Sequence, residues 1–154
     1  MKSLFISFFI LLFFSSFIPG VRTVKLFGKS QSGRTIFNAE LEDMSSLRKA
    51  ELIIDNEKLA FTYSDRCYVT FDPEVKVFTL QLESEANGNL DTLRYINFWA
   101  IPSSFKEVSN EEIVSGETYK FSAKLVAKDP RKAKVKEYET PTIVLSCILT
   151  YSYP

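Results

Sequence analysis

The stretch that decides the fold class is YKFSAKLVAK, residues 119–128. Its odd-numbered positions carry Tyr, Phe, Ala, Leu and Ala, whereas four of its five even-numbered positions carry Lys or Ser. Strict alternation of apolar and polar residues is typical of a β-strand with one face in the core and one in water. Asp129 and Pro130 then end the run. The sequence therefore predicts a long amphipathic strand over this stretch.

Shorter runs of the same kind occupy the rest of the chain and are separated by turn residues. Asp55-Asn56-Glu57 lies between two such runs and predicts a hairpin, as does Asn87-Gly88. Residues 93–101 show little polar alternation, so we expect this strand to be buried on both faces. The other expected strands are residues 24–28, 35–41, 52–54, 59–63, 67–71, 75–82 and 143–151.

Helical patterns are confined to two short pieces. Residues 43–50 fit two helical turns with Met44 and Leu47 inward, and Ser109 followed by Glu112 resembles a capping box. Many short strands with turns between them favour a sandwich or barrel, because an open sheet of this size leaves edges and a bare face. We predict an all-β (mainly β) fold: an antiparallel β-sandwich of about eight or nine strands with at most two short helical turns.

The first twenty residues have the order of a secretory signal. Lys2 supplies positive charge, residues 4–14 are almost entirely Phe, Leu and Ile, and small or helix-breaking residues follow up to Gly20. This apolar run is shorter than the roughly 20 residues of a membrane-spanning helix, although an uncleaved anchor is the alternative. We expect a signal peptide over 1–20 and one β-sandwich domain over 21–154, secreted or periplasmic, with no stable membrane anchor after signal removal.

Composition argues against several functional classes. The 19 basic and 19 acidic residues balance, unlike the strongly basic surface of a nucleic-acid-binding protein. There is no His, which removes Ser-His and Cys-His catalysis and the commonest ligand of transition metals. We therefore expect no enzyme activity, no cofactor and no metal site. A hydrolase that uses paired carboxylates is the less favoured alternative, with Asp72 and Glu74 or Glu111 and Glu112 as its candidates.

Two cysteines remain, and both share the apolar face of an expected strand. Cys67 alternates in phase with Val69 and Phe71, and Cys147 with Leu145 and Leu149. Export places them where disulfides persist, so we predict a structural disulfide between Cys67 and Cys147. Two buried free thiols are the alternative.

The candidate partner-binding residues are basic side chains and two tyrosines. Positive charge gathers at the end of the 119–128 strand and in the loop after it, where it could meet an acidic partner, an anionic glycan or an anionic membrane surface; a charged loop that is simply solvated is the alternative. Tyr68 and Tyr138 are the aromatic residues expected to be exposed. We expect a non-catalytic domain that binds an unknown protein; the alternative is a carbohydrate- or small-ligand-binding module that uses exposed tyrosines. The candidate residues are Tyr68, Lys124, Lys128, Arg131, Lys132, Lys134, Lys136 and Tyr138.

Overall fold

The computed structural model describes residues 21–84, 93–108, 116–132 and 138–152. In this part of the chain it contains ten strands and two short 3₁₀ turns. The strands are β1 (Thr23–Lys29), β2 (Thr35–Glu42), β3 (Ser46–Ile54), β4 (Glu57–Thr62), β5 (Arg66–Asp72), β6 (Val77–Glu83), β7 (Tyr95–Ala100), β8 (Lys106–Val108), β9 (Gly116–Ala127) and β10 (Ile143–Ser152). The turns are η2 (Pro102–Ser104) and η3 (Pro130–Lys132). No helix among these residues is long and apolar enough to cross a membrane.

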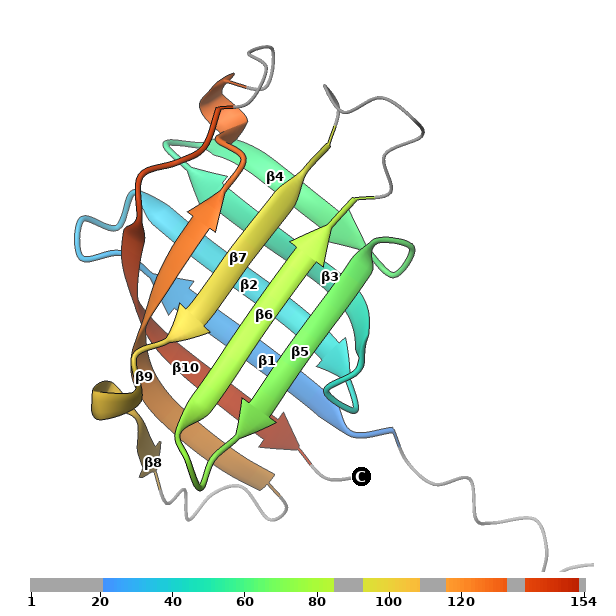
Figure 1. Ribbon diagram of the computed structural model, residues 1–154, viewed down its shortest axis with the longest axis vertical. Helices are drawn as coiled ribbons and strands as arrows, with labels where there is room; N and C mark the ends of the chain where they lie inside the picture. The colour runs from blue at the N-terminus through green and yellow to red at the C-terminus, as the bar shows by residue number, and fades with distance from the viewer. Residues whose placement is uncertain (1–20, 85–92, 109–115, 133–137, 153–154) are drawn as a thin grey trace, which may run out of the picture.

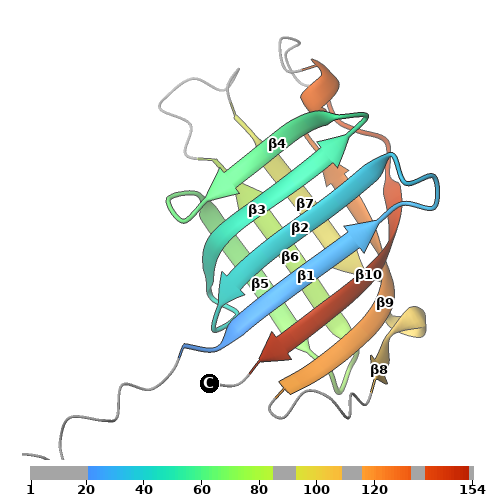
Figure 2. The same ribbon diagram turned by 180° about the vertical axis from the view of Figure 1, so that it is seen from behind.

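All ten strands belong to one antiparallel sheet that curls strongly on itself. Its order is β4-β3-β2-β1-β10-β9-β7-β6-β5, and β8 pairs with the first half of β9. Figure 1 shows β5, β6 and β7 as a front layer that crosses β1 to β4 behind it, and Figure 2 shows the same molecule from behind. The sheet thus forms a half-barrel whose two edge strands, β4 and β5, follow each other in the chain.

The all-β class is confirmed, but the predicted two-sheet sandwich of eight or nine strands is wrong. The difference arises at β9, which pairs with β10 of the back layer over residues 116–125 and with β7 of the front layer over residues 123–127. One continuous set of backbone hydrogen bonds therefore joins the two layers. Alternation along each strand predicts a buried face, and it does so equally well for two packed sheets and for one curled sheet.

The core lies between the two layers and is rich in aromatic rings. Phe98 of β7 contacts Phe37 of β2 across the layers, with ring centroids 5.5 Å apart. It also contacts Phe78 and Phe121, at 5.8 and 6.4 Å. All four side chains are buried. Such ring pairs add to the stability that burial of their apolar area provides, and the Phe37–Phe98 pair joins the front layer to the back layer.

The predicted helix over residues 43–50 is absent. Asp43 and Met44 have φ values of 49° and 56°, which make a tight turn between β2 and β3, and β3 starts at Ser46. Leu47 is buried as expected, but as a strand residue. A spacing of three between two apolar residues fits a helix face, and it equally fits a turn residue followed by an inward strand residue. The Ser109 capping box lies outside the described residues.

Two local expectations about strands can also be compared with the structure. The hairpin at residues 55–57 is confirmed, because Asp55 and Asn56 both have positive φ and join β3 to β4. β7 is not buried on both faces, since Asn97 is exposed between two buried neighbours. The Asn87-Gly88 turn lies outside the described residues.

Candidate functional site

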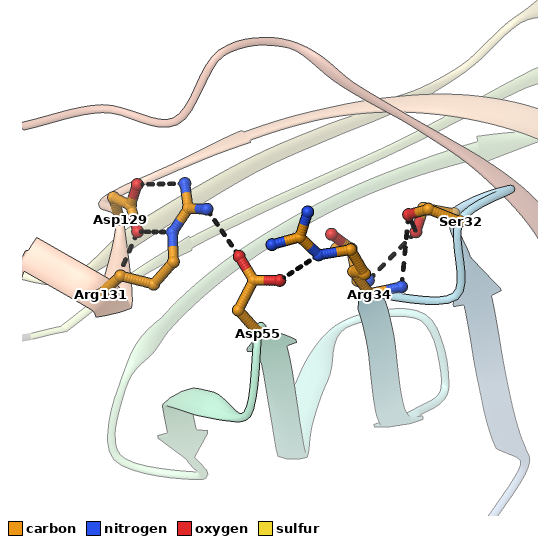
Figure 3. A network of polar contacts seen from close by, with 7 residues as sticks. Ser32, Arg34, Asp55, Asp129 and Arg131 are labelled. Atoms are coloured by element: carbon orange, nitrogen blue, oxygen red, sulfur yellow. Dashed lines mark hydrogen bonds and ion pairs between the residues drawn. The ribbon is translucent and has the colours of Figure 1, made fainter.

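Arg131, in the predicted basic cluster, is bound by two carboxylates. Its backbone N–H and its Nε donate to Asp129 Oδ1 at 3.0 and 2.9 Å, and its Nη2 donates to Asp129 Oδ2 at 2.7 Å. Its Nη1 donates to Asp55 Oδ2, in the β3–β4 turn, at 2.8 Å. Figure 3 shows that Asp55 also contacts Arg34, which lies in the β1–β2 turn. The positive charge of Arg131 is thus balanced within the chain.

This network fixes three turns to one another. Hydrogen bonds from Arg131 hold the pKa of the Asp129 carboxyl below its usual value, against the opposing effect of burial. Hydrogen bonds from Arg131 and Arg34 do the same to the pKa of Asp55. Because η3 also packs against β3 and β4, the contacts dock the β9–β10 connection onto the β3–β4 hairpin. The arrangement supports a structural role.

The other predicted basic residues have different surroundings. The Lys132 ammonium lies 3.6 Å from the ring centroid of Tyr138, a cation–π contact. Lys124 is exposed on the outer face of β9, whereas Lys128 is buried. Lys134 and Lys136 lie outside the described residues. The described members therefore do not share a single exposed surface.

The predicted disulfide is not present, because both cysteines are free. Cys147 is buried on β10, where a Cβ at Gly28 of β1 would lie 3.0 Å from its sulfur. Cys67 is half-buried on the edge strand β5, which three other strands separate from β10 in the sheet order. Alternation places both thiols on the inner face but does not say whether inner-face residues are neighbours. Burial raises the pKa of Cys67 to about 11 and that of Cys147 to about 12.

Tyr68 is exposed on the outer face of β5, as predicted, with 58% of its surface accessible. Tyr63, in the β4–β5 turn, is more exposed, at 85%. Tyr138 is 37% exposed and carries the Lys132 contact. Tyr68 lies within β5, whereas Tyr138 lies in the connection between β9 and β10.

An open groove with a volume of about 760 Å³ lies on the outer face of the back layer. Cross-strand neighbours line it. One row runs Ile148, Phe27, Asn38, Glu51 and Ala60 from β10 to β4. The residues of the next row that line it are Thr150, Lys25, Glu40 and Lys49.

Apolar and charged side chains adjoin in this groove. Phe27 and Ile148 are directly opposite each other on β1 and β10 and are 43% and 39% exposed. Glu40 accepts a hydrogen bond from Arg48 Nη1 at 3.0 Å and lies 3.5 Å from Lys49 Nζ. Burial opposes ionisation of Glu40, but these two cations outweigh it and keep its pKa below the usual value.

Sequence reasoning did not find the groove. The available signal was an apolar residue at an outward position: Phe27 is out of phase with Val24 and Leu26, and Ile148 with Cys147 and Leu149. That signal appears in two separate strands, and only the pairing of β1 with β10 brings the two residues together.

Within the described residues, no group of three or more acidic or cysteine side chains is placed to hold a metal ion. No protein-family model matches the chain, and neither a curated protein nor a solved structure shows significant similarity to it.

Proposed function

We propose that this chain is an exported, non-catalytic binding domain and that a segment of a protein partner lies in the groove on the outer face of β10, β1, β2, β3 and β4. The observation that carries the proposal is the exposed pair Phe27 and Ile148 in the wall of that groove. An aromatic residue beside an aliphatic one, with a polar rim, is the composition found at the centre of protein–protein interfaces.

The charges of the groove favour a polypeptide over a polyanion. Its lining contains two lysines, Lys25 and Lys49, and two glutamates, Glu40 and Glu51. A nucleic acid or an acidic glycan would meet both signs of charge, whereas a peptide with apolar and charged side chains can match both.

The non-catalytic part of the proposal rests on composition and on the state of the thiols. The chain has no His to activate a nucleophile. A reactive cysteine needs a lowered pKa, and burial raises the pKa of both cysteines here. Asp72, one of the carboxylates considered for hydrolysis, instead accepts backbone N–H groups of Glu74 and Val75 in the β5–β6 turn.

The test is a capture experiment with matched variants. The tagged chain is cross-linked in an extract of its native exported compartment, and untagged chain is added as competitor. Phe27→Ser and Ile148→Ser should each reduce the recovered partner about tenfold or more, since removing a central apolar anchor costs roughly 2 kcal/mol. Val144→Ser is the control, because Val144 is an exposed apolar residue of β10 that does not line the groove.

Two outcomes would argue otherwise. Equal recovery with Phe27→Ser and with the unaltered chain would remove the groove from the proposal. Recovery of a glycan that is lost with Tyr68→Ala would support the carbohydrate-binding alternative, which the exposure of Tyr63 and Tyr68 favours.

A further inference from the structure

β5 differs from every other long strand in its burial. Its residues alternate between exposed and half-buried, and none is buried. The other described strands of six or more residues each bury at least two side chains. The inner-face residues of β5 are Cys67, Val69 and Phe71, all apolar. The described residues therefore leave part of the core surface uncovered along this strand.

β5 is also an edge of the sheet. Among the described strands it pairs with β6 alone, and Figure 1 shows it at the margin of the front layer. The other edge strand, β4, packs against η3. An edge strand presents unpaired N–H and C=O groups, which bind another strand most readily when no Pro or charge protects them. Residues 67–71 contain neither Pro nor a charged residue.

The charges of β5 stand only at its two ends and have opposite signs. Arg66 and Asp72 are both exposed on the outer face. Arg66 is opposite Glu83 of β6 in the sheet register, yet neither Arg66 nor Asp72 forms an ion pair with a described residue. The strand is thus self-complementary. If a second copy of β5 lies antiparallel beside the first, Arg66 of each copy lies beside Asp72 of the other.

We propose that two copies of the chain pair through β5, antiparallel about a two-fold axis at Val69. In this register Arg66 is opposite Asp72 of the second copy, and Tyr68 is opposite Thr70 of the second copy. Directly opposed residues of an antiparallel pair share a face, so both ion pairs lie on the outer face. The half-buried inner-face residues of each copy extend the core of the other. The sheet then continues from one copy to the next through an interface of the kind that closes a symmetric dimer.

This inference does not depend on the proposed function, since the groove lies on the other layer of the sheet. Sedimentation of the full chain, purified after expression in a secreting host, should show a dimer that dissociates on dilution. Arg66→Asp and Asp72→Arg each place like charges opposite each other twice in the dimer. Each should raise the dissociation constant about tenfold or more.

Mixing the two variants gives the sharper result. A heterodimer of Arg66→Asp with Asp72→Arg has Asp opposite Arg at both ends, so the mixture should dimerise as the unaltered chain does. Local damage to either variant would not produce this recovery. Native mass spectrometry distinguishes the heterodimer from both homodimers by mass.

Asp72→Arg also removes the acceptor for the Glu74 and Val75 N–H groups, so a variant that leaves the turn intact is needed. Tyr68→Lys puts a charge at the centre of the edge and should weaken dimerisation as strongly. Lys25→Asp, in the groove, is the control and should leave the dimer unchanged. A chain that stays monomeric at millimolar concentration would overturn the proposal, as would a dimer that Arg66→Asp and Tyr68→Lys do not weaken.

Discussion

At the residue scale, the two cysteines show how a side chain's surroundings set its chemistry. Both are free, and burial raises the pKa of Cys67 to about 11 and that of Cys147 to about 12. The position facing Cys147 on β1 is Gly28, and a Cβ there would come within 3.0 Å of the sulfur. Close packing against this sulfur, rather than the demands of a turn, therefore explains why position 28 carries Gly.

We predict that these thiols react slowly in the folded protein. Only the thiolate is alkylated, and a rise of roughly two pKa units lowers its fraction about a hundredfold at pH 8. Iodoacetamide should therefore label Cys67 about a hundred times more slowly in the native protein than in denaturant, and Cys147 more slowly still, as peptide mass spectrometry can measure. Two labels should enter the denatured chain without reductant. No label there would establish the disulfide that the structure lacks.

At the scale of the elements, the Asp129–Arg131 contact joins η3 to the β3–β4 hairpin. The Asp129 side chain is fully buried and that of Arg131 is 36% exposed. Arg131→Ala leaves the buried carboxylate without its cation and should lower the free energy of unfolding by about 2 kcal/mol. This is less than the loss of about 3–5 kcal/mol for a fully buried pair, because water screens Arg131. Urea unfolding measures the change, and Arg34→Ala, which alters a more exposed ion pair, should have a much smaller effect.

The same contact predicts a direction for the effect of pH. The folded-state pKa of Asp129 lies below its ordinary value of about 3.9, so the unfolded chain binds this proton more readily. The stabilisation is therefore complete above about pH 5 and is lost as the pH falls through the folded-state pKa. Thermal unfolding between pH 7 and pH 2 should show a smaller loss for Asp129→Asn than for the unaltered chain. If the unfolding temperature fell equally with pH in Asp129→Asn and in the unaltered chain, this assignment would be contradicted.

For the whole molecule, the order of the described strands makes the chain a meander that is interrupted twice: β4 does not pair with β5, and β8 pairs with β9 but not with β7. β1 pairs with both β2 and β10, so Thr23 and Ser152 are neighbours near the two ends of the described chain. Among the described strands, the sheet is open between β4 and β5, which the chain joins through an exposed turn. The turn therefore joins β4 and β5 covalently, although no backbone hydrogen bonds pair these two strands.

A circular permutant should therefore fold. We predict that the chain cut between Tyr63 and Ser64, with the end after β10 joined to the start of β1 by a short linker, keeps its β-rich circular dichroism spectrum and unfolds cooperatively. All strand pairs are retained, and the new ends fall at an exposed loop. Cutting instead between Ile148 and Leu149, within β10, should abolish folding. A permutant at Tyr63 that remained unfolded would show that the turn itself is required.

Much of the local structure could be predicted from residues alone. The alternation in residues 119–128 correctly placed Phe121, Ala123 and Leu125 in the core, and the Asp55-Asn56 turn followed from residues that accept positive φ. The failures, at residues 43–50 and at the cysteine pair, came from patterns that two different structures satisfy equally.

The candidate site was predicted less well. Tyr68 was correctly placed on the surface, but Arg131 turned out to be bound by Asp55, a residue 76 positions away in the sequence. The groove depends on Phe27 and Ile148, which are separated by most of the chain and meet only through the pairing of β1 with β10. Contacts between segments far apart in the sequence cannot be predicted from the local periodicity of apolar residues.

By itself, then, the sequence determined the all-β class and the inner face of most strands, because a period of two in hydrophobicity follows directly from the geometry of an extended chain. Only the tertiary structure decided that the two layers belong to one curled sheet, that the two thiols stay apart, and that no described strand pairs with the outer edge of β5. Those features depend on which strands pair, and many pairings bury the same residues.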